Sequence, residues 1–184
     1  MPSDTFATGG DRYTRTAAAL HWLLALMIVG ALGMGMYMTD LPLSPQRMRL
    51  TNWHKWAGVT ILLLSALRLL WRLTHAPPPD VPMPGWQRRL AHTTHGLMYA
   101  LFFAVPLVGW GYSSAAGYPV VWFGVLPLPD LVAADRALAA TLKPLHGALA
   151  RVLAALVLLH IAGALKHQVI DRDGLLRRMR LTRR

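Results

Sequence analysis

The chain has 184 residues, of which 54% are hydrophobic, and a formal net charge of +11. The apolar residues are gathered in blocks of about 20, the length that crosses a bilayer as a helix, so a soluble nucleic-acid-binding protein is excluded. The sequence has no cysteine, which excludes disulfides, iron–sulfur clusters and thiolate zinc sites. Any metal must therefore be held by nitrogen or oxygen atoms.

Four apolar segments predict four transmembrane helices, at about residues 17–38, 53–73, 92–114 and 145–167. Proline-rich connections separate them: LPLSPQR, HAPPPDVPMPGW and GYPVVWFGVLPLPD. The first residues lack the pattern of a cleavable signal peptide, so the first span is expected to stay in place. We therefore expect one all-α membrane domain over residues 1–184, with a basic tail at 168–184.

The basic residues predict the orientation of these helices. One side of the membrane receives 12 of the 19 lysines and arginines, mostly near the N-terminus, before the third span and in the tail. Because basic loops stay inside, both termini should be cytoplasmic. We interpret the tail as an orientation and headgroup-binding device, with a nucleic-acid or partner-binding arm as the alternative. The opposite, outer side carries five basic residues near the helix ends, namely Arg47, Arg49, Lys55, Arg136 and Lys143.

Two histidines of the fourth span, His146 and His160, are about four helical turns apart. On a helix this separation returns to within about 40° of the same face and covers about 21 Å. Histidine inside a membrane is costly and usually functional, and imidazole is a common axial ligand of haem iron. The spacing therefore predicts axial ligands at two depths, one for each of two haems stacked across the membrane.

Depth supplies a second histidine at each level. His21 begins the first span on the cytoplasmic side, at the level of His160, and His54 begins the second span on the outer side, at the level of His146. We call His21 and His160 the inner pair and His54 and His146 the outer pair. A single histidine at a span end is usually interfacial, but two pairs matched in depth favour ligation of two haems.

Other polar residues in the spans have more than one interpretation. Arg68 follows His54 at the same separation as the two histidines of the fourth span, and either binds a haem propionate or extends to the interface. His167 either assists a quinone, as hydrogen-bond donor or proton relay, or faces headgroups. His92 and His95 either bond a propionate or quinone or replace a ligand of the inner haem. Arg151 receives no role.

Four stretches resemble the bacterial cytochrome b561 family, and in particular its superoxide:ubiquinone oxidoreductase branch. They are the HW at the start of span one, the H…R…R-x-x-x-x-P pattern of span two, the LAH-x-x-H before span three, and the LK-x-x-H of span four, whose histidine is followed on nearly the same face by His160 and His167. Lys55 and Arg151 depart from the pattern that we associate with this family, which leaves open what binds at the outer surface.

The resemblance implies a four-helix bundle enclosing two b-type haems, with axial pairs His21/His160 and His54/His146. It also implies a ubiquinone site on the cytoplasmic side involving His167. Superoxide would give its electron at the outer haem, and quinone would be reduced at the inner one. The outer basic residues either form a cationic funnel for this anion or only solubilise the loops.

Two other functions fit the sequence less well. The chain could be the two-haem membrane anchor of a dehydrogenase or hydrogenase, which would pass electrons to the quinone pool, although its short loops offer little docking surface. It could also be a haem-free transporter or structural protein with buried histidines. We therefore expect lipid, ubiquinone and superoxide as partners, with no nucleic acid and no required protein subunit.

Overall fold

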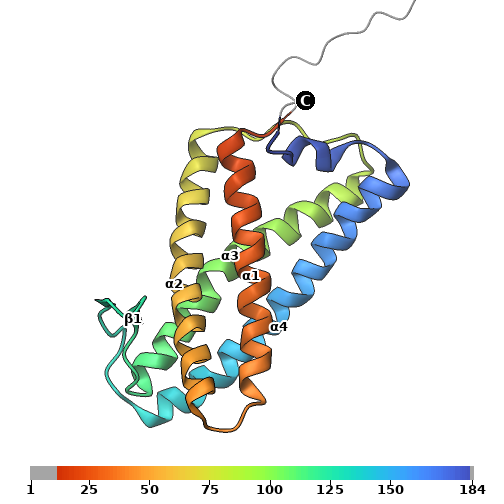
Figure 1. The fold of residues 1–184 in the computed structure, drawn as a ribbon. Helices are drawn as coiled ribbons and strands as arrows, with labels where there is room; N and C mark the ends of the chain where they lie inside the picture. Colours follow the sequence, from red (N-terminus) through yellow and green to blue (C-terminus); the bar gives the residue numbers. More distant parts are fainter. Residues whose placement is uncertain (1–11, 183–184) are drawn as a thin grey trace, which may run out of the picture.

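A computed structural model describes residues 12–182 and arranges four long helices up and down (Figure 1). They are α1 (Arg15–Thr39), α2 (Pro45–Thr74), α3 (Gly85–Ala115) and α4 (Arg136–Lys166). All four are long and apolar enough to cross a membrane. The expected all-α membrane bundle of four helices is confirmed, whereas its two haems remain a proposal. The helices are longer than the apolar spans predicted for them, most clearly α2 and α4, which begin well before residues 53 and 145.

Side-chain caps explain where three of the helices begin. Thr14 accepts a hydrogen bond from the backbone N–H of Ala17, Ser44 accepts one from Arg47, and Asp135 accepts two from the first turn of α4. These oxygens satisfy N–H groups that have no partner within the helix. α2 ends immediately before the HAPPP segment, where proline disfavours a helical conformation in the preceding residue.

The helices are not packed equally. α1 lies against α2, α2 against α3 and α3 against α4, while the described part of α4 makes few close contacts with α1 or α2. In Figure 1, α3 and α4 run together at an angle to α1 and α2. A core cluster joins all four helices at mid-bundle, with members Leu24, Ile28, Ala31, Ile61, Met98, Phe102, Val105 and Leu153. α4 contributes only Leu153 to it among the described residues, so its attachment depends largely on α3.

The connection between α3 and α4 contains a short β-hairpin that the sequence did not predict. Strands β1 (Val121–Trp122) and β2 (Leu126–Pro127) pair antiparallel. Between them the chain turns through Phe123 and Gly124, both with positive φ. The indole N–H of Trp56 donates to the carbonyl of Val121 at 2.7 Å, and that of Trp122 donates to Thr60 at 3.3 Å. These two bonds hold the hairpin against α2.

The described part of the basic tail folds back onto the bundle. It forms a π-helical turn η1 (His167–Asp171) and a 3₁₀ turn η2 (Leu175–Met179) at the end of the bundle where α1 begins (Figure 1). The indole N–H of Trp22 donates to the carbonyl of Met179, and the guanidinium of Arg178 donates to that of Pro79. Up to residue 182 the tail is therefore a docked cap rather than a free arm.

Candidate functional site

The inner pair consists of one histidine from α1 and one from α4. The ring centroids of His21 and His160 are 6.1 Å apart and the ring planes meet at 72°. His21 lies in the second turn of α1, and His160 lies two turns before α4 ends. The structure thus brings together the two residues that depth matching placed at one level.

The outer pair has nearly the same geometry at the other end. The rings of His54 on α2 and His146 on α4 have centroids 6.0 Å apart and an interplanar angle of 87°. Both rings are partly buried. The two pairs therefore join α4 to α1 and to α2, the two helices with which α4 makes few close contacts.

The spacing of each pair suits two ligands of one metal ion. An imidazole nitrogen binds a transition-metal ion at about 2 Å and lies about 1 Å from its own ring centre, so opposed ligands have centroids about 6 Å apart. The observed 6.1 and 6.0 Å agree with this distance. Two imidazoles per level are also the ligand set of a six-coordinate haem iron, so the residues fit that group.

The helix α3 orients both histidines of α4. Nδ1 of His146 lies 3.0 Å from the carbonyl oxygen of Val105, and Nδ1 of His160 lies 3.3 Å from Nε2 of His95. A carbonyl only accepts, so Nδ1 of His146 carries a proton and its Nε2 keeps a lone pair for a metal. Such a bond at the other ring nitrogen is typical of metal-binding histidines.

Two glycines make room for the outer pair. A Cβ on Gly109 would come within 2.8 Å of the His146 ring, and one on Gly35 within 3.1 Å of the His54 ring. At the other glycines of the long helices, Gly30, Gly33, Gly58, Gly147 and Gly163 among them, an added Cβ would meet no histidine. The sequence carries a signal for Gly35 and Gly109, because they follow His21 and His95 at the same separation that joins His146 to His160.

This separation of about four turns recurs on every helix. It joins His21 to Gly35, His54 to Arg68, His95 to Gly109 and His146 to His160. Each helix therefore presents one group at the inner level and one at the outer level on nearly the same face. Four helices with one shared spacing are what a two-level site requires.

Arg68 lies at the inner level, as its separation from His54 predicts. Its Nε donates to the hydroxyl of Tyr99 at 3.0 Å and its Nη1 to the carbonyl of Ala17 at 3.4 Å. The Arg68 side chain is partly buried. Both partners are neutral, and no carboxylate pairs with Arg68 among residues 12–182, so an anion such as a haem propionate fits beside it.

The remaining polar residues lie outside the pairs. His92 is exposed and contacts Asp80 at 2.9 Å, while His75 stacks on Trp71 with centroids 3.8 Å apart. Arg151 is exposed on α4. Lys55 donates to the carbonyls of Tyr118 and Pro119, so it ties α2 to the loop before the hairpin.

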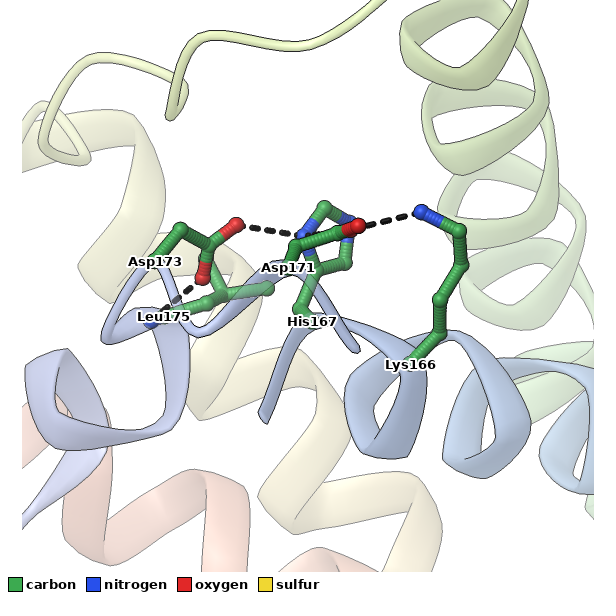
Figure 2. A network of polar contacts seen from close by, with 5 residues as sticks. All are labelled: Lys166, His167, Asp171, Asp173 and Leu175. Atoms are coloured by element: carbon green, nitrogen blue, oxygen red, sulfur yellow. Dashed lines mark hydrogen bonds and ion pairs between the residues drawn. The ribbon is translucent and has the colours of Figure 1, made fainter. Parts of the chain in front are cut away.

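His167 is held by two carboxylates at the start of the docked tail (Figure 2). Its Nδ1 lies 2.5 Å from Asp173 and 3.2 Å from Asp171, and Lys166 contacts Asp171 at 2.6 Å. The pKa of Asp173 is lowered: burial opposes this, but hydrogen bonds from the Leu175 N–H and from His167 favour the ionised carboxylate. The three residues have metal-ligand spacing, but their facing atoms already bond one another and Lys166. We therefore interpret them as an ion-pair network that orients His167.

Four apolar helices with histidine pairs at two depths are the arrangement typical of membrane cytochromes b. Comparison with known proteins gives the family. The family model described as prokaryotic cytochrome b561 matches residues 12–180. The chain belongs to this family of membrane b-type cytochromes, as the sequence resemblance predicted.

Curated relatives match over nearly the whole length. The chain is 33% identical to cytochrome b561 homolog 2 of Escherichia coli K12, over 95% of this chain and 94% of the relative. It is 32% identical to a probable superoxide oxidase, CybB, of Yersinia pestis, over 91% and 95%. Cytochrome b561 homolog 1 of Escherichia coli K12 is 27% identical, over 92% and 97%.

Proposed function

We propose that this chain is a two-haem cytochrome b of the bacterial inner membrane that oxidises superoxide to oxygen and reduces ubiquinone. The observation that carries the proposal is the presence of two cross-bundle histidine pairs with nearly equal spacing. The 32% identity to a probable superoxide oxidase supports the choice of reaction. Two superoxide anions would each give up one electron, and one quinone would take up two electrons and two protons.

His21 and His160 would hold one haem and His54 and His146 the other, with Arg68 paired to a propionate at the inner level. Each bound haem b would supply a centre that accepts and releases one electron at a time. The carbonyl of Val105 fixes the tautomer of His146 and leaves its Nε2 free for iron. His146 would thus be a ligand of fixed orientation and tautomer.

The outer end of the bundle would receive the superoxide anion. Arg49, Arg136 and Lys143 are exposed there, and no carboxylate pairs with them among the described residues. Exposed cations of this kind attract a small anion from solution. Lys55 is partly buried, next to His54, and would add positive charge at the outer pair itself.

At the inner end, His167 would bind the quinone. It lies about two helical turns after His160, and its Nδ1 faces Asp171 and Asp173. With its Nδ1 proton donated to the carboxylates, neutral His167 has a lone pair on Nε2; once Nε2 takes up a proton, the imidazolium would donate it to a quinone carbonyl, as quinol formation requires. The two carboxylates hold the imidazole in place and connect it to the surface of the tail.

The experiment uses the full chain purified alone in detergent with its haem. Enzymatically generated superoxide is added while the α band of reduced haem b is followed, with and without superoxide dismutase and then with ubiquinone. We expect the band to rise, dismutase to suppress the rise, and quinone to make it decay. Haem that stays oxidised under superoxide would favour an anchor subunit with a missing partner, and a colourless protein would contradict both functions.

A variant separates the two ends of the reaction. His167→Ala should leave the superoxide-dependent rise intact but slow the decay on adding quinone by about 100-fold or more, the usual contribution of a general acid. His75→Ala is the matched control, because His75 stacks on Trp71 outside both pairs and should change neither phase. Equal decay in the His167 variant and the unmodified chain would place the quinone elsewhere.

A further inference from the structure

His95 belongs to neither of the two pairs, yet it lies beside one of them. Its Nε2 is 3.3 Å from Nδ1 of His160, and the two ring centroids are 5.2 Å apart. It is therefore nearer to His160 than His21 is, although His21 is the partner at that level. Its position on α3 makes it a third imidazole at the inner level.

The protons of this contact follow from the ligand role of His160, and the inference rests on that part of the proposed function. A neutral imidazole has one N–H and one lone pair. Because Nδ1 of His160 faces His95, a metal would be bound through Nε2. Nδ1 of His160 then carries the proton and donates it to Nε2 of His95, which acts as the acceptor. His95 is thus unable to use the same nitrogen as a ligand.

The outer level offers a direct comparison. There Nδ1 of His146 also donates to α3, but to the backbone carbonyl of Val105 at 3.0 Å. The ring nitrogen His54 Nδ1 is buried without a hydrogen-bond partner in the described part of the chain. The two levels therefore differ in what accepts the ligand proton, a carbonyl at the outer level and an imidazole nitrogen at the inner level.

An acceptor on the distal N–H of a ligating imidazole makes the ring a stronger electron donor to the metal. Stronger donation stabilises oxidised iron more than reduced iron, and therefore lowers the midpoint potential. We propose that His95 is a positioning residue that accepts a hydrogen bond from Nδ1 of His160, fixes its ring and lowers the midpoint potential of the haem held by the inner pair.

His92 provides a matched control. It is a histidine on the same helix, one turn earlier, but it is exposed and contacts Asp80 rather than a ligand. His95 is also exposed, so replacing either residue should not open a cavity in the core. A difference between the two sets of variants then reports the bond to His160.

The experiment is a redox titration of the full holoprotein, followed at the α band, together with low-temperature electron paramagnetic resonance of the oxidised haems. His95→Phe keeps a ring but removes the acceptor, and His95→Ala removes both without steric demand. His95→Gln restores an acceptor through its amide oxygen. His92→Phe is the control, and haem content is measured for each protein.

We expect all variants to keep two haems per chain. His95→Phe and His95→Ala should raise the midpoint potential of one haem and change the g-values of that haem alone. His95→Gln should bring both quantities back toward those of the unmodified chain, and His92→Phe should leave both haems unchanged. A shift of the second haem to the same extent would overturn the proposal.

Two other results would also contradict it. If all three His95 variants lose one haem, His95 is itself a ligand and not a positioning residue. If Phe and Ala leave both potentials and both sets of g-values unchanged, the contact with His160 has no electronic effect. The proposed function fails separately, since an unmodified chain with fewer than two six-coordinate haems would refute it before any variant is compared.

Discussion

The space beside the His146 ring is so small that one added carbon atom at Gly109 would fill it. A methyl group there would lie 2.8 Å from Cε1 and 3.0 Å from Nδ1 of His146. Nδ1 is the atom that bonds the Val105 carbonyl, so the ring would be pushed away both from its acceptor and from His54. The outer level therefore depends on a residue without a side chain.

Gly109→Ala should lower haem content to about half, because one of two sites loses the orientation of its ligand. Gly111→Ala is the control: on the same helix, its Cβ would make an ordinary contact at 3.5 Å with Leu142. The measurement is haem per chain by pyridine haemochrome, with protein yield in parallel. Equal haem content in the two variants would contradict the role given to Gly109.

The pairing of the histidines could be predicted from spacing and depth, since helix geometry and bilayer thickness are general. The contacts around the histidines could not be predicted in this way. Whether His95 is a ligand or a neighbour of a ligand depends on the rotation of α3, which sequence spacing does not give. The roles of all five histidines in haem binding stay predictions until tested.

Among the elements, the docking of the tail could not be predicted from the sequence, and the reason is local. A run of basic residues indicates a solvated or headgroup-binding segment, but here Arg172 and Gly174 both have positive φ and turn the chain back toward α1. Asp173, between them, accepts bonds from His167 and from the N–H of Leu175. The β-hairpin could not be predicted either, because its short strands depend on hydrogen bonds to Trp56 and Thr60, which are far away in the sequence.

Asp173→Asn should release this cap at pH 7. A spin label on Leu181→Cys, in an otherwise cysteine-free chain, should be immobile in the parent and mobile in the variant. Asp130→Asn, in the loop before α4, is the control. Because the pKa of Asp173 is lowered in the folded chain, its stabilisation is present above the ordinary carboxyl pKa of about 3.9 and is lost as pH falls through the lowered value.

The parent label should accordingly stay immobile from pH 7 to pH 5 and become mobile only below the ordinary carboxyl range. Release between pH 5 and 7 would contradict the role given to Asp173. An unchanged spectrum in the Asn variant would mean that Trp22 and Arg178 hold the tail without the carboxylate.

For the whole molecule, the distribution of basic residues predicts the orientation in the membrane. The docked tail and the start of α1 lie at one end, and that end should be cytoplasmic. Green fluorescent protein fused after residue 184 should fluoresce, and alkaline phosphatase inserted between residues 128 and 134 should be active. The reverse pattern would place His167 on the outer side and exclude cytoplasmic proton uptake there.

The unequal packing of the helices leads to a prediction about haem as a structural element. α4 packs on α3, whereas in the described residues it makes few close contacts with α1 and α2 and meets them through the histidine pairs and the core residue Leu153. A ligand that binds only the folded state stabilises it, so haem held by these pairs should fasten α4 to the α1–α2 side of the bundle.

Loss of haem should therefore loosen one interface and spare the other. The double variant His21→Ala/His54→Ala removes one proposed ligand at each level and keeps the bonds that His146 and His160 make to α3. In this variant, spin labels at Leu26 on α1 and Leu158 on α4 should show a broadened distance distribution. Labels at Leu97 on α3 and Leu158 should keep a narrow one. All three positions are at least half exposed, so the labels themselves should not disturb the core. Broadening of both distributions would mean that α3 alone cannot hold α4, and broadening of neither would mean that the polypeptide sets the bundle geometry without haem.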